Sequence, residues 1–252
     1  MKSTGQAILY IFLFLVTGLN GESMVLQRDQ LSLDPSIRYG KLPNGLTYYI
    51  KSIDNRSSEL HIRLLIKAGW AQEGPGQNEL AHVMEHYGIN DVAHSPNGKF
   101  YDAAKKAGIR HTDIRGWTYP EATIYGFKTT KENKKAQEIG FLLFQDILWN
   151  VEFTTQNINK ERLTVLNEYD MKKGGKTAFS IMNHIRSSIT GFGAASPNDF
   201  EQHMKSFKES ALVRFYEDWY HPNLAAIVIV GAIDNVDAIE RSIKQKFSKG
   251  SK

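Results

Sequence analysis

Hydrophobic and polar residues alternate in three short stretches of the chain, and a fourth stretch is almost continuously apolar. Alternation is typical of strands with one buried face, and β-branched and aromatic residues are frequent in all four stretches. The continuous run is typical of a central strand. We therefore predict strands within residues 45–52, 59–69, 121–130 and 224–233.

Other stretches place an apolar residue every three or four positions, which is the period of an amphipathic helix. This pattern predicts helices within residues 79–88, 131–150, 155–171, 179–189, 198–220 and 235–247. Two strands, a helix, a strand, several helices, a strand and a last helix follow one another along the chain. This mixed order predicts an α+β fold in which several helices pack on a largely antiparallel sheet.

The composition supports one globular domain. The 252 residues are 41% hydrophobic, and 31 Lys and Arg are nearly balanced by 27 Asp and Glu, which is unlike a disordered chain. No linker rich in Pro, Gly and Ser interrupts the sequence after residue 40. The net charge of +4 is spread along the chain, so binding to nucleic acid is not expected.

The N-terminal residues 1–21 have the pattern of a secretory signal peptide. Lys2 precedes an apolar run from Ala7 to Val16, and cleavage could follow Gly18 or Gly21. The run is short for a membrane span, so we expect an exported protein, periplasmic or extracellular, with no stable membrane span after cleavage. An uncleaved N-terminal anchor is the alternative. The chain has no cysteine, which excludes disulfides and a lipid-modified cysteine.

The first predicted helix carries two histidines, His82 and His86, four positions apart, with Glu85 directly before the second. Imidazoles at this spacing point the same way and can bind one metal ion, and a carboxylate beside them can deprotonate a metal-bound water. The solvated face of an ordinary helix is the alternative, but this motif is rare by chance in a chain with eight histidines. We expect Asn78 to cap the helix and Gly88 to end it. Four apolar residues form the opposite face: Leu80, Val83, Met84 and Tyr87.

The helix predicted at residues 155–171 offers a third protein ligand, which a hydrolytic zinc site requires besides an open position for water. Glu161 and Glu168 are seven residues apart and share one face. Leu163 and Leu166 point roughly the other way and are expected to bury the helix. Two carboxylates on one stripe also fit a solvated edge, so the metal interpretation depends on the histidine pair upstream.

The H-x-x-E-H sequence at residues 82–86, followed by the paired glutamates of ERLTVLNE, resembles the inverted zincins of the insulinase and pitrilysin type, peptidase family M16. The resemblance covers about residues 37–250 and implies a single domain of the LuxS/metallohydrolase type. Three further segments match the family in the same order: KLPNGLTYYI, GWTYPEATIYGF and WYHPNLAAIVIVGAID.

The resemblance also implies roles for individual residues of the two motif helices. The zinc ligands would be His82, His86 and Glu168. Glu85 would be the general base that activates the water. Glu161 would be a further carboxylate that steadies the site.

In this family a strand with an Asn-Ala-x-Thr pattern binds the substrate backbone, and the matching sequence here is Arg-Gly-Trp-Thr. Arg115, Gly116 and Thr118 are therefore the predicted substrate-binding residues. Arg115 replaces a side-chain amide that is expected to contact the peptide, which leaves the specificity open. Strand addition through the backbone alone could survive this replacement.

The sequence thus predicts an exported, zinc-dependent endopeptidase that hydrolyses peptides or small unfolded polypeptides through a metal-activated water. Working family members resemble several such domains in succession, and this chain ends after one. A homologous domain, a homologous subunit or a homodimer mate is therefore the expected partner. Two alternatives stay open: a non-catalytic subunit that holds peptides or supports assembly, and a fragment of a longer M16 enzyme.

Overall fold

The computed structural model describes residues 32–53, 57–90, 99–172 and 197–248, together with residues 185 and 188. The predicted signal peptide and most of the helix predicted at residues 179–189 lie outside this part of the chain. The helices and strands that the structure describes all belong to the unit Pro35–Lys252.

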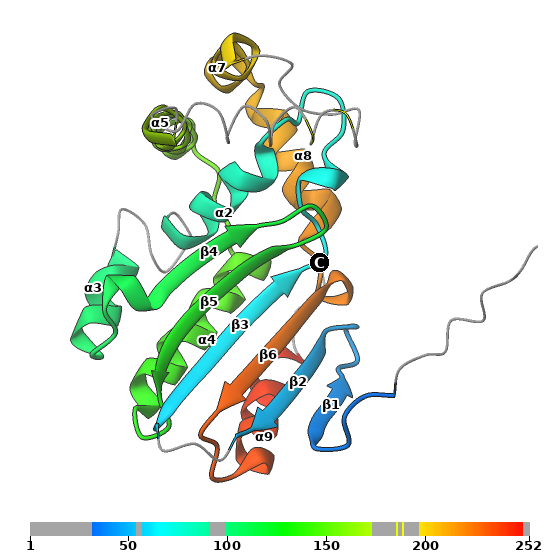
Figure 1. Ribbon diagram of the computed structural model, residues 1–252, viewed down its shortest axis with the longest axis vertical. Helices are drawn as coiled ribbons and strands as arrows, with labels where there is room; N and C mark the ends of the chain where they lie inside the picture. Colours follow the sequence, from blue (N-terminus) through cyan, green and yellow to red (C-terminus); the bar gives the residue numbers. More distant parts are fainter. Residues whose placement is uncertain are drawn as a thin grey trace, which may run out of the picture. The chain divides into compact units, whose positions relative to one another are not determined.

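Six strands of this unit form one sheet (Figure 1). They follow the order β1-β2-β6-β3-β5-β4, so β6 lies between two strands that are consecutive in sequence. β2 and β6 run parallel, and the four other neighbouring pairs are antiparallel. The predicted α+β class with a largely antiparallel sheet is confirmed. The strands are β1 (Ile37–Lys41), β2 (Thr47–Ser52), β3 (Glu59–Ile66), β4 (Ile114–Thr118), β5 (Thr123–Thr130) and β6 (Ala225–Gly231).

One face of the sheet forms the core. Along β3 every second residue from Leu60 to Ile66 is buried, whereas His61 and Arg63 are exposed. β2 and β6 alternate in the same way. Helices α4 (Lys134–Trp149) and α9 (Val236–Phe247) cover the buried face, and Figure 1 shows both behind the sheet. Apolar surface removed from water between these two layers provides the main stabilisation of the fold.

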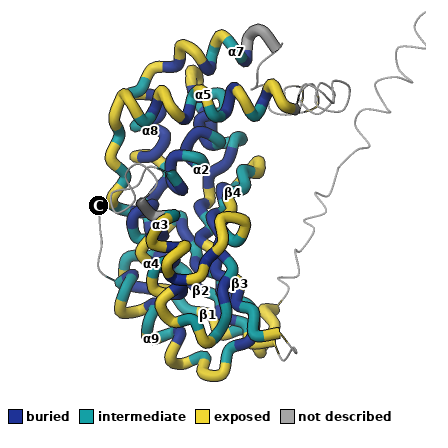
Figure 2. Tube along the Cα trace, turned by 90° about the vertical axis from the view of Figure 1, so that its left-hand side faces the viewer, coloured by how far each residue is buried: buried dark blue, intermediate teal, exposed yellow. Residues whose placement is uncertain are grey.

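Helix α2 (Leu80–Asn90) is buried along most of its length, as its dark blue trace in Figure 2 shows. It contacts β4 and β5 of the sheet and also α4, α5 and α8. Among the helices that the structure describes, none is long and apolar enough to cross a membrane. The other helices are α3 (Lys99–Lys106), α5 (Thr155–Lys172), α7 (Pro197–Ser206) and α8 (Glu209–Trp219).

Residues 198–220, which were predicted to lie in one helix, contain two helices that separate at Phe207 and Lys208. Arg162 of α5 donates a hydrogen bond of 2.5 Å to the carbonyl oxygen of Phe207, and its guanidinium lies 3.7 Å from the centre of the Phe207 ring. The Phe207 carbonyl oxygen therefore contacts α5 instead of taking part in a further helical turn. The sequence pattern also did not separate β1, β4 and α3 from their surroundings, because these elements are short.

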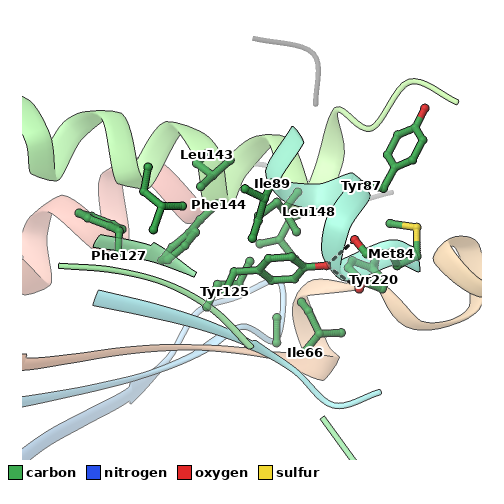
Figure 3. Close-up of a cluster of buried hydrophobic side chains, with 14 of the residues drawn as sticks. Ile66, Met84, Tyr87, Ile89, Tyr125, Phe127, Leu143, Phe144, Leu148 and Tyr220 are labelled. Atoms are coloured by element: carbon green, nitrogen blue, oxygen red, sulfur yellow. Dashed lines mark hydrogen bonds between the residues drawn. The ribbon is translucent and has the colours of Figure 1, made fainter. Parts of the chain in front are cut away.

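Tyr125 of β5 joins the sheet to α2 (Figure 3). Its hydroxyl donates to the carbonyl oxygen of Met84 at 2.9 Å and lies 2.8 Å from the hydroxyl of Tyr220. Burial raises the pKa of both phenols above the usual value, so both stay neutral. A Cβ atom on Gly88 would lie 2.8 Å from the Tyr125 ring. Gly88 therefore permits this close approach, and α2 continues past it to Asn90 instead of ending there as predicted.

Replacing Tyr125 by Phe should lower the free energy of unfolding by about 1–3 kcal/mol, because the buried Tyr220 hydroxyl loses the Tyr125 hydroxyl as a partner. Urea denaturation measures this change. Tyr39→Phe is the matched control, since Tyr39 is 48% exposed and its loss of a hydroxyl should change stability by less than about 0.5 kcal/mol. Equal stability of the two variants would contradict the role given to Tyr125.

Candidate metal centre

A buried carboxylate holds the irregular turn from which α2 begins. Glu73 is 2% exposed, and its two oxygens accept hydrogen bonds from the backbone N–H groups of Glu79 and Ala81, each at 3.0 Å. Amides at the start of a helix have no partner within the helix, so Glu73 supplies the cap. Asn78, predicted as the cap, lies one residue too early, because Glu79 directly precedes the first helical residue.

The two faces predicted for α2 are confirmed. Its apolar stripe is fully buried, and His82 and His86 lie on the other face with 20% of each side chain exposed. Glu168 of α5 faces the same point, with 31% of its side chain exposed. The Nε2 atoms of the two histidines are 3.2 Å apart and lie 3.1 and 3.3 Å from the same Glu168 oxygen, Oε2.

These three side chains could hold a zinc ion. Ligand atoms at about 2.0–2.1 Å from a tetrahedral ion lie about 3.3 Å from one another, and the three observed distances are 3.1 to 3.3 Å. Two imidazole nitrogens and one carboxylate oxygen form a donor set that zinc prefers, and three protein ligands leave a fourth position for water. The residues therefore fit the metal that the sequence motif implies.

The charges around the histidines also favour a cation. Burial lowers the pKa of His82, but hydrogen bonds to Glu168 and Glu79 outweigh it and raise this pKa to about 10. The same carboxylates would attract a metal ion, and zinc would have to displace the proton because only neutral imidazole is a ligand. The contact with Glu79 was not predicted, although a carboxylate three residues before a ligand-type histidine was a signal in the sequence.

Glu161, for which the family resemblance implies a steadying role, lies close to His86. Its side chain is fully buried, and its Oε2 atom is 3.6 Å from Nδ1 of His86. Its other oxygen, Oε1, accepts a hydrogen bond from Asn90 at 3.3 Å. Glu161 thus faces the ring nitrogen of His86 that points away from Glu168.

The orientation predicted for the rest of α5 was wrong in one respect. Leu163 is 62% exposed, whereas Leu166 is buried as expected. The buried stripe of the helix instead runs through Ile158, Glu161 and Val165. This side of α5 faces α2. Glu161, which lies beside His86, is therefore buried, whereas the apolar pattern favoured Leu163 for the buried face.

Glu85 does not belong to the three converging side chains but lies beside them, held by β4. Its Oε2 atom accepts a hydrogen bond of 2.7 Å from the hydroxyl of Thr118. A Cβ atom on Gly116 would lie 2.5 Å from the Glu85 side chain, so this carboxylate lies close against the backbone of β4. Two of the three predicted substrate-binding residues are therefore next to the predicted base.

Arg115 lies on the other side of β4. Neighbouring residues of a strand point to opposite faces, and the exposed Arg115 donates a hydrogen bond of 3.2 Å from Nε to the Thr112 carbonyl. It lines a separate groove over the open face of the sheet. Of the three predicted substrate-binding residues, Arg115 is the one that the structure does not bring to the histidines.

The histidines, Glu85 and Glu168 lie in a pocket of about 510 Å³. Its aromatic lining was not predicted, because most of these side chains come from elements far apart in sequence. The ring of Tyr169 stacks on that of Phe200 with 3.9 Å between the centroids, which joins α5 to α7. The aromatic residues of the lining are Trp70, Trp117, Tyr119, Tyr169 and Phe200.

The chain belongs to the insulinase family, peptidase family M16, whose model matches residues 49–183. It is 27% identical over 255 residues to the probable zinc protease PqqL of Haemophilus influenzae, covering 99% of this chain and 27% of the relative. The chloroplastic stromal processing peptidase of Arabidopsis thaliana is 25% identical, with 87% of this chain and 17% of the relative covered.

The crystal structure of the periplasmic protease PqqL from Escherichia coli has the same fold. It matches with a TM-score of 0.75 and 23% identity over 87% of this chain and 24% of that chain. The chain therefore spans about a quarter or less of the length of these relatives. The M16-type fold expected from the motifs is the fold observed.

The purified chain should bind about one zinc ion, and Glu168→Gln should bind it much more weakly because a charged ligand is lost. Metal analysis after dialysis against limiting zinc measures the difference. Glu138→Gln is the control, since Glu138 is 70% exposed and lies on α4 outside the pocket. Equal and near-zero zinc in the wild type and Glu168→Gln would exclude a site at these residues.

Proposed function

We propose that this chain is the catalytic domain of an exported, zinc-dependent endopeptidase with peptides or small unfolded polypeptides as substrates. The convergence of His82, His86 and Glu168, with Glu85 beside them, carries this proposal. Membership of the M16 family and the zinc proteases among the relatives support it. The signal-like N-terminus, and the description of a PqqL structure as that of a periplasmic protease, support export.

Zinc bound to this site would supply Lewis acidity toward the attacking water and the peptide carbonyl. Glu85 would act as the base, taking a proton from the water and returning it to the leaving amine. The Thr118 hydroxyl donates to one Glu85 oxygen at 2.7 Å, which fixes the orientation of the carboxylate. The presence of this complete set favours an enzyme over the non-catalytic subunit that the sequence left open.

The substrate would bind along β4. This strand pairs with β5 on one side and is the last strand of the sheet, so its outer edge can accept an extended peptide as a further strand. Gly116 and Thr118 would then lie between the peptide backbone and Glu85. Arg115, on the opposite side of β4, would contact only substrate side chains that point away from the metal.

Efficient catalysis would require a homologous second domain, subunit or homodimer mate. One sheet edge holds a peptide from one side only, and correct positioning of the reacting groups is worth several kcal/mol of the barrier. The second half would supply the opposite wall of the cleft and its hydrogen-bond donors for the developing oxyanion. That the relatives extend far beyond the matched length supports this requirement.

Glu85→Gln should retain zinc but lose turnover by about 10²–10⁴-fold, because the proton acceptor is removed while the ligands stay. A quenched fluorescent peptide reports turnover, and metal analysis of the same sample reports zinc. A variant with full zinc that cleaves the peptide at the wild-type rate would refute Glu85 as the base.

The isolated chain should cleave an unstructured peptide slowly, and its specific activity should rise when a homologous second half is added as a separate chain. The assay covers a wide range of protein concentrations. A steep rise of specific activity with concentration, without the second half, would identify a homodimer as the partner. High specific activity that is independent of concentration and of any partner would contradict the requirement.

A further inference from the structure

We propose that Glu79 is a positioning residue for His82, which it orients so that Nε2 faces His86 and Glu168. This inference rests on the proposed zinc site. The Glu79 Oε2 atom lies 3.5 Å from Nδ1 of His82, while the other ring nitrogen lies 3.1 Å from Glu168. The His82 ring is therefore held between two carboxylates, one at each nitrogen.

The backbone at Glu79 is strained. Within the part of the chain that the structure describes, Glu79 is the one non-glycine residue with a positive φ, at 64°. A left-handed conformation brings Cβ too close to the backbone, so every residue except glycine loses stability there. Strain of this kind persists where the surrounding structure enforces it and is frequent at functional sites.

Hydrogen bonds on both sides of Glu79 enforce this conformation. Its N–H donates to the buried Glu73 carboxylate at 3.0 Å, and its carbonyl oxygen accepts the first helical hydrogen bond, from Val83, at 2.9 Å. Glycine would satisfy the same backbone contacts without strain. What glycine lacks is the carboxylate that reaches His82, so the side chain accounts for a strained residue at this position.

The second histidine also has a carboxylate on the side of its Nδ1 atom. Glu161 lies 3.6 Å from Nδ1 of His86 and comes from α5, whereas Glu79 comes from the turn just before the histidine helix itself. A carboxylate at Nδ1 fixes the tautomer that carries its hydrogen there and leaves the Nε2 lone pair for a metal. His86 thus also has a carboxylate near its Nδ1 atom, at a distance longer than a hydrogen bond.

A purely structural role is the competing explanation, because a negative charge near the start of a helix is stabilising. Three substitutions separate the two. Glu79→Gly removes both the carboxylate and the strain, Glu79→Ala removes the carboxylate but keeps the strain, and Glu79→Gln keeps the strain and an oxygen that can accept from Nδ1. Zinc affinity, from competition with a chelator, and the melting temperature of the zinc-free protein are measured for each.

The proposal expects zinc affinity to fall about 10–100-fold in both the Gly and the Ala variants and to be largely restored in the Gln variant. In zinc-free protein the Gly variant should melt above the Ala variant by about 2–4 °C, because only glycine relieves the strain. Glu138→Gln, on the exposed side of α4, is the control for the loss of one charge. Melting temperature should thus separate the Gly and Ala variants, whereas zinc affinity should not.

A zinc affinity of the Ala variant within twofold of the wild type would overturn the proposal. A zinc affinity that is higher in the Gly variant than in the Ala variant, in the same order as their melting temperatures, would also overturn it. A purely structural role predicts that order. If His82→Ala abolishes zinc binding while Glu79→Ala does not change it, the metal site stands and only the role of Glu79 fails. A wild type that binds no zinc overturns both.

Discussion

The packing of α2 between the sheet and α5 is the constraint on which the rest of the site depends. The apolar stripe of this helix enters the core, and Tyr125 fixes its distance from β5 through the Met84 carbonyl. A helix held in this way has only one face left, and that face carries His82 and His86. The histidines meet Glu168 because α5 packs against the same helix. The convergence of these three side chains thus follows from the way one amphipathic helix is buried.

The site concentrates negative charge at the cost of stability. Glu161 is fully buried and Glu79 has a strained backbone, and burying carboxylates is unfavourable unless a positive group compensates. Lys160, 3.2 Å from Glu161, provides such compensation for that carboxylate, and protonated His82 provides it for Glu79 and Glu168, which raise its pKa to about 10. A divalent cation would compensate more strongly. We therefore interpret the centre as an arrangement of side chains that lowers the stability of the fold and favours metal binding, which is common at functional sites.

Local features of the fold could be predicted from the sequence, and features that depend on distant contacts could not. The two faces of α2 follow from helical periodicity, so His82 and His86 were placed correctly. The insertion of β6 between β2 and β3 depends on pairing across most of the chain. Apolar periodicity favoured Leu163 over Glu161 for the buried face of α5. A local pattern contains no information about His86, which lies on another helix beside Glu161.

The geometry of turns and helix ends could not be predicted from the sequence pattern either. Gly88 suggested a helix end, yet it makes room for the Tyr125 ring. Glu73 caps α2 from seven residues before the first helical residue, Leu80, and residues at that distance are not examined by local capping rules. The M16 motifs implied ligand roles for these side chains, whereas the contacts around them depend on the folded structure.

The central claim is that His82, His86 and Glu168 together bind zinc. X-ray absorption at the zinc K-edge, on protein loaded with one equivalent, tests it most directly. The account predicts two imidazole nitrogens and oxygen ligands at about 2.0–2.1 Å in four-coordinate geometry, with one imidazole lost from the spectrum of His86→Ala. A spectrum with oxygen ligands alone, or one that His86→Ala leaves unchanged, would contradict it.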